Sequence, residues 1–100
     1  MTTKIQESGN LLTAFFSGRL DTAAAVAVTD AVKPLLDATD KEIVLDCSEL
    51  EYISSSGLRI FLSIRKEAAA HGSKVIVRSI NADIRQVFVM TGFISLFEIQ

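Results

Sequence analysis

The chain has 100 residues, of which 49% are hydrophobic and 22% are charged, with ten basic and twelve acidic side chains. This length excludes two domains and predicts one domain over residues 1–100, whose core needs no disulfide or metal to hold it. The net charge of −2 provides no basic surface for phosphate backbones, so we expect no nucleic-acid partner.

The N-terminal segment predicts a β-hairpin followed by an amphipathic helix. Ser8-Gly9-Asn10 is a turn signal between a short polar strand, about residues 3–7, and an apolar strand over residues 11–16. Asp21 and Thr22 then offer N-cap oxygens to a segment whose apolar residues recur at steps of three and four.

The middle of the chain predicts a helix end, a buried strand and a loop. Pro34 cannot donate a backbone hydrogen bond inside the helical pattern, which predicts an end or a kink near Val32. The continuous apolar run over residues 43–45 is typical of a central strand and ends at Asp46. We expect a loop from Asp46 through Tyr52.

The second half of the chain predicts two helices and two strands. The clearest helix runs from Ser56, has a wide apolar stripe and ends near Gly72. A β-branched strand over residues 75–77 follows, and a short helix capped by Asn81 precedes a last edge strand near residues 96–99.

The predicted element order is therefore ββαβαβαβ. Strands joined by helices of ten or more residues imply right-handed crossovers and parallel pairing, while the hairpin adds one antiparallel pair. We predict an α/β fold with a mixed, mostly parallel sheet of four to five strands.

The sequence also predicts the cellular compartment of the protein and whether it inserts into a membrane. The first residues contain neither a basic segment nor an apolar segment of the kind found in signal peptides, so we expect a cytoplasmic protein. No apolar run approaches the ~20 residues that span a bilayer, and we expect no membrane insertion.

Ser54, Ser55 and Ser56 stand together immediately before Gly57 and the clearest helix. A helix needs only one N-cap oxygen, which leaves two hydroxyls for another role. A phosphoryl group there would place about −1.5 to −2 charges beside free backbone N–H groups at the positive end of the helix. The alternative is that all three are only capping and loop serines.

The residue types that carry chemistry indicate neither an enzyme nor a cofactor. His71 is the only histidine and lies about four helical turns from the serines, so a catalytic triad cannot form; it is interpreted as a polar group near a helix C-terminus. Cys47 has no C-x-x-C partner, and its neighbours in the chain are acidic. Both features favour a packed side chain over a reactive thiol. Asp46 lacks the paired acids of a magnesium pocket and is interpreted as ordering the loop after it. We expect no metal site, because His and Cys occur once each without ligand spacing.

The segment from Ile43 to Leu58 resembles the signature of the STAS domain, as found in bacterial anti-sigma factor antagonists. Residues 17–21 are similar to the family's G-x-L-D turn before its first helix, and Met90-Thr91-Gly92-Phe93 also matches. The resemblance covers nearly the whole chain.

The resemblance implies a switch. An unphosphorylated antagonist of this family binds an anti-sigma factor that is also a serine kinase, and thereby frees a sigma factor for transcription. Phosphorylation by that kinase ends the binding, and a PP2C-like phosphatase restores it. The family's acceptor is the first serine of Asp-Ser-Ser-Gly, which falls on Ser55, with Ser54 and Ser56 as alternatives; Ser54 replaces the aspartate.

A partner-binding surface follows from the same match. Asp21 matches the family's acidic turn residue, and Arg59, Ser63 and Lys66 share a polar stripe of the serine helix. We call the expected surface the docking face and assign to it Asp21, Ser54, Ser55, Ser56, Gly57, Arg59, Ser63 and Lys66. The alternative is a helix face that is only solvated.

Two other functions remain open on the sequence. The first is a non-switching STAS interaction subunit, such as the cytoplasmic partner of a lipid-transport ATPase, and the missing aspartate is what keeps it open. The second is a small enzyme or phosphocarrier that uses Cys47.

Overall fold

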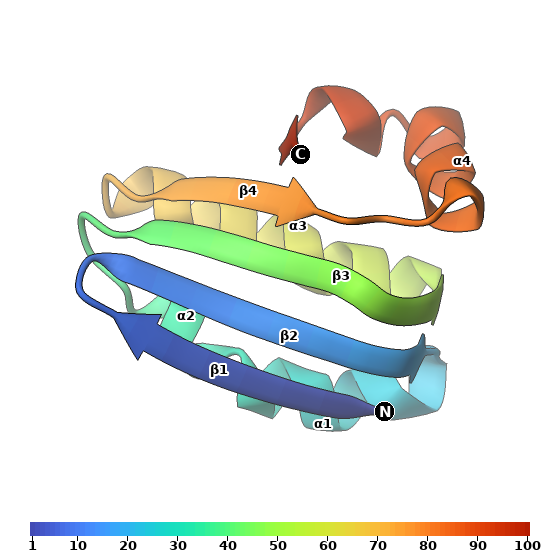
Figure 1. Ribbon diagram of the computed structural model, residues 1–100, viewed down its shortest axis with the longest axis horizontal. Helices are drawn as coiled ribbons and strands as arrows, with labels where there is room; N and C mark the ends of the chain where they lie inside the picture. The colour runs from blue at the N-terminus through green and yellow to red at the C-terminus, as the bar shows by residue number, and fades with distance from the viewer.

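The computed structural model describes all 100 residues and consists of one five-stranded sheet with helices packed on one face (Figure 1). Its elements are β1 (Thr2–Ser8), β2 (Leu11–Leu20), α1 (Thr22–Ala31), α2 (Lys33–Leu36), β3 (Glu42–Ile53), α3 (Ser55–Ala70), β4 (Lys74–Arg78), α4 (Ala82–Thr91), the 3-10 turn η1 (Phe93–Ser95) and β5 (Glu98–Ile99). The predicted α/β fold and the order ββαβαβαβ are confirmed.

The five strands lie in the sheet in the order in which they occur in the chain. β1 pairs antiparallel with β2, and all the other neighbours are parallel. Because each crossover steps one strand further in the same direction and has the same hand, the helices accumulate on one side. Figure 1 shows α1, α2 and α3 behind the sheet, with no helix over its near face.

The core lies between the sheet and these helices. Phe61 of α3 stands at its centre, with its ring centroid 5.3 Å from that of Phe16 and 6.4 Å from that of Phe88. All three side chains are fully buried, and each contributes about 1.5–3 kcal/mol through burial alone. This aromatic contact fixes α3 on the sheet. None of the helices is long and apolar enough to span a membrane.

The boundaries of α1 and α2 agree with their local signals, whereas α3 begins at Ser55, one residue before the predicted start. The Asp21 carboxylate caps α1 by accepting from the N–H of Ala24 at 2.8 Å. α1 stops at Val32, and Pro34 falls in the first turn of α2, where its missing N–H costs nothing. The predicted helix end near Val32 is confirmed.

The loop predicted from Asp46 through Tyr52 is wrong. β3 continues to Ile53 and pairs with the end of β2, with Leu50 opposite Gly18 and Ile53 opposite Leu20. Acidic residues are poor strand formers by propensity, which is why this segment resembled a loop. The pairing with β2 and the burial of Leu50 and Ile53 override that propensity.

Residues 17–21, predicted as a turn, are also mostly strand. β2 extends to Leu20, with irregular pairing to β3 between Phe15 and Ser17 and again after Gly18. Gly18 has a φ of +100°, a conformation that glycine adopts without the cost paid by other residues. The chain leaves the sheet only at Asp21, which caps α1.

Candidate partner-binding site

The two segments that carry the candidate residues meet at the carboxyl ends of β2 and β3. The N–H of Ser54 donates to the carbonyl oxygen of Leu20 at 2.8 Å. α1 therefore begins beside α3, at the right-hand edge of the sheet in Figure 1. This bond brings Asp21 and the three serines, more than thirty positions apart in the chain, to one edge of the molecule.

The three serines have different environments. Ser54 is only 8% exposed, and its Oγ accepts from the N–H of Gly57 at 3.2 Å as the N-cap of α3. Ser55 is exposed at the first position of the helix, and its hydroxyl makes no hydrogen bond within the protein. Ser56 is half-buried and faces α1. Ser55 thus offers the most accessible hydroxyl.

Gly57 is buried under the site. A Cβ at this position would lie 2.7 Å from Leu20 Cγ and 2.9 Å from Ile53 Cγ1, closer than packed carbon atoms approach. Glycine lets the first turn of α3 rest directly on the ends of β2 and β3. Of the residues assigned to the predicted docking face, Gly57 and Ser54 are buried, whereas Ser55 is exposed.

A groove of about 460 Å³ runs between α1 and α3. Its walls are formed by Thr22, Ala25, Val26, Thr29, Val32, Leu36, Ser56, Arg59, Ile60 and Ser63. Val26 is 76% exposed and presents an aliphatic side chain on the wall of the groove. Arg59 and Ser63 of the predicted docking face line this groove, while Lys66 is exposed one turn further along. The sequence did not reveal the groove, because it exists only once the two helices are side by side.

An aromatic residue and a cation face each other near the ends of β2 and β3. Arg19 of β2 lies opposite Tyr52 of β3, and its guanidinium carbon is 4.4 Å from the centre of the tyrosine ring. Tyr52 is 41% exposed. Tyrosine and arginine are enriched where proteins bind one another. Sequence reasoning missed this pair, because it had placed both residues outside the sheet.

A model of the STAS domain matches residues 2–100. The chain belongs to the STAS domain family. It is 29% identical over 89 residues to BtrV of Bordetella bronchiseptica, named as a candidate anti-sigma factor antagonist, and the match covers 89% of this chain and 77% of BtrV.

Solved structures show the same fold. A candidate anti-sigma factor antagonist from Thermotoga maritima superposes with a TM-score of 0.88 at 19% identity, covering 97% of this chain and 84% of that one. SpoIIAA, a Bacillus cell fate determinant in its phosphorylated form, superposes with a TM-score of 0.74 at 18% identity, covering 99% of this chain and 91% of SpoIIAA.

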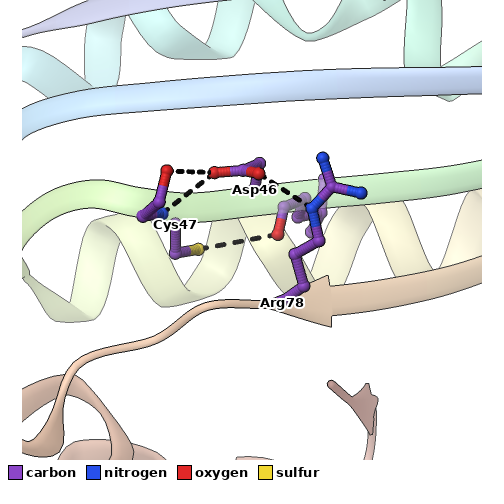
Figure 2. A network of polar contacts seen from close by, with 5 residues as sticks. Asp46, Cys47 and Arg78 are labelled. Atoms are coloured by element: carbon purple, nitrogen blue, oxygen red, sulfur yellow. Dashed lines mark hydrogen bonds and ion pairs between the residues drawn. The ribbon is translucent and has the colours of Figure 1, made fainter.

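In this STAS domain, Asp46 ties β3 to β4 on the face of the sheet that bears no helix (Figure 2). Its Oδ2 is 2.8 Å from Arg78 Nε, and its Oδ1 accepts from the Ser48 N–H at 3.0 Å and hydroxyl at 2.6 Å. Burial raises the pKa of Asp46, but the bonds from Ser48 and the Arg78 charge outweigh it and hold the pKa below its ordinary value. Asp46 was expected to order a loop after it, and this is wrong, because the residues that follow, including its partner Ser48, belong to β3.

Cys47 and His71 lie apart from the serines. The Cys47 thiol points away from Asp46 toward the carbonyl oxygen of Leu45 (Figure 2) and is 1% exposed. Burial, with a smaller effect of the Asp46 charge, raises its pKa to about 12, so the thiol is a packed, protonated group, as predicted. His71 caps the C-terminus of α3, about 24 Å along the helix from Ser55, and cannot act on the serine hydroxyls.

Proposed function

We propose that this STAS domain is an anti-sigma factor antagonist whose binding is switched by phosphorylation of Ser55. In its unphosphorylated state it binds an anti-sigma factor that is also a serine kinase, and so frees a sigma factor for transcription. A PP2C-like phosphatase restores the binding state. The STAS domain acts as a cytoplasmic binding protein rather than as an enzyme.

The observation that carries the proposal is the difference between Ser54 and Ser55. The Ser54 oxygen is buried and occupied by the N–H of Gly57, whereas the Ser55 hydroxyl is exposed and has no partner. A kinase must reach an oxygen from solvent, so Ser55 is the accessible acceptor. Ser56 is half-buried on the wall of the groove and is the next candidate.

The serine at position 54 also keeps the local geometry that the family's aspartate would provide. Aspartate and serine are almost equally good N-caps, because each presents an oxygen to the N–H groups of the first turn. Ser54 makes that bond. The loss of the aspartate therefore leaves the acceptor serine in place and favours the switch over a non-switching interaction subunit.

Two relatives support the assignment. BtrV carries the name of a candidate anti-sigma factor antagonist, and SpoIIAA has been solved in a phosphorylated form. The family membership of this chain makes the same type of partner the best-supported one.

Phosphorylation would act directly at the docking face. A phosphoserine adds about −1.5 to −2 charges, which must be desolvated in the interface and which repel any facing carboxylate. A loss of ~3 kcal/mol weakens binding more than a hundredfold. No rearrangement of the sheet is required, because Ser55 is already at the surface.

The test is phosphorylation by the anti-sigma factor kinase of the same organism in the presence of ATP. We expect one phosphate, mapped to Ser55 by fragmentation mass spectrometry, in the unmodified chain and in Ser56→Ala. Ser55→Ala should take up none, and full labelling of that variant would refute the assignment.

Calorimetry with the same kinase tests the effect on binding. Ser55→Ala should bind as the unmodified chain does, while Ser55→Asp should bind more weakly. Equal affinities for the alanine and aspartate variants would contradict the electrostatic account.

A further inference from the structure

Arg59 is the only charged residue among those that line the groove between α1 and α3. It is exposed, and none of the four ion pairs of the protein includes it. Its positive charge is therefore available to a group that is absent from the unmodified protein.

The position of Arg59 relative to Ser55 indicates what that group is. The two residues are four positions apart in α3, a spacing that places their Cβ atoms about 5–6 Å apart on one face of the helix. Helical side chains lean toward the N-terminus. The Arg59 side chain lines the groove beside Ser56, and at this spacing it is long enough to reach a group on Ser55.

We propose that Arg59 is the internal counter-ion of phosphorylated Ser55. On phosphorylation its guanidinium pairs with the phosphate, so the groove loses its one cation at the same moment as the docking face gains a dianion. The inference rests on the proposed function for its biological meaning, and it extends that function by naming the residue through which the phosphate also changes the groove.

Other charged groups at this end of the molecule are less suited to the role. The Arg19 guanidinium of β2 is already stacked on the Tyr52 ring of β3. The Asp21 carboxylate at the start of α1 repels a phosphate and is bonded to the N–H of Ala24. Lys66 lies about 16 Å from Ser55 along the helix and serves as the matched control.

The experiment is a ³¹P NMR titration of the full chain with phosphoserine introduced at position 55 by genetic encoding. A guanidinium beside the phosphate lowers its second pKa, which is about 6 in phosphoserine. At low salt we expect Arg59→Gln to raise this pKa by about 0.3–0.7 unit relative to the parent protein. Arg59→Lys should restore part of the difference, and Lys66→Gln should change the pKa by less than about 0.1 unit.

A second signal excludes a merely structural effect. The NMR resonance of the Arg59 Nε–H should move when phosphoserine replaces Ser55, whereas that of Arg85 in α4 should not. An unchanged phosphate pKa in Arg59→Gln, or an equal change in Lys66→Gln, would overturn the inference.

Because the phosphate is installed during synthesis, the titration does not depend on any kinase. If the kinase left Ser55 unmodified, the proposed function would fail while the titration could still show the Arg59 contact. If the titration failed but the kinase modified Ser55, the function would stand without this role for Arg59.

Discussion

Gly57 and Leu20 are in contact where the first turn of α3 crosses the end of β2, and a Cβ at residue 57 would approach Leu20 Cγ to 2.7 Å. The same junction is held by the hydrogen bond from the Ser54 N–H to the Leu20 carbonyl oxygen. Together these contacts hold the start of α3, with the exposed Ser55 hydroxyl, next to the end of β2 where α1 begins. The glycine of the serine motif is thus explained by packing.

Replacing Gly57 with alanine should destabilise the protein by about 1–3 kcal/mol. In an ordinary helix position the same change stabilises by roughly 0.5–1 kcal/mol, so the sign of the effect tests the contact with Leu20 and Ile53. Urea denaturation followed by circular dichroism measures it. Ser63→Ala, at an exposed position of the same helix, is the control and should change stability by less than about 0.5 kcal/mol.

Replacing Ser54 with alanine should cost about 0.5–2 kcal/mol, because the N–H of Gly57 loses its cap. Ser54→Asp should restore most of the stability. Ser55→Ala should have almost no effect, since its hydroxyl has no bond to lose. Thermal unfolding of the three variants measures their relative stabilities. An equal loss of stability in the two alanine variants would show that Ser54 is not the cap.

The Asp46–Arg78 pair predicts a dependence of stability on pH. The pKa of Asp46 lies below its ordinary value of 3.8 in the folded protein, so its stabilising effect is full above pH 3.8 and is lost as the pH falls through the folded-state pKa. At neutral pH, Asp46→Asn should cost about 1–2 kcal/mol, a figure reduced for the solvent exposure of Arg78. The difference from the parent protein should shrink in strong acid.

The control for this prediction is the exposed Asp30–Lys33 pair. Asp30→Asn should change the free energy of unfolding by less than about 0.5 kcal/mol at neutral pH. If Asp30→Asn lost as much free energy of unfolding as Asp46→Asn, the effect would come from the change of net charge and not from the hydrogen bonds and ion pair of Asp46.

The thiol of Cys47 should be unreactive in the native protein. Its burial and its pKa of about 12 leave almost no thiolate at mildly alkaline pH, and the thiolate is the nucleophile. A thiol-exchange reagent should therefore label Cys47 only after denaturation. Rapid labelling of the folded chain would reopen a role for Cys47 as a redox or phosphocarrier group.

The caps and turns were predictable because they depend on residues three or four positions apart. Asp21, Asn81 and the proline at 34 act through their own first turn, and each behaves as the local signal indicates. The serine triplet was likewise visible in the chain. Which serine is buried was not, because three identical side chains differ only in where the helix begins.

The features that the sequence concealed all depend on distant pairing. The extension of β3 beyond Asp46 exists because residues 49–53 pair with β2, against their own weak strand propensity. The same pairing places Arg19 over Tyr52. Neither contact produces a local sequence pattern, because its two partners are more than thirty residues apart in the chain.

The sequence by itself determined the order of strands and helices, the caps of α1 and α4 and the place of the serine motif, because the hydrophobic period and the caps are local properties. The tertiary structure alone decided which hydroxyl faces solvent, where the groove lies and which cation lines it. Those properties depend on contacts between β2, β3, α1 and α3 at one edge of the molecule, because burial and charge pairing exist only once these elements are packed together.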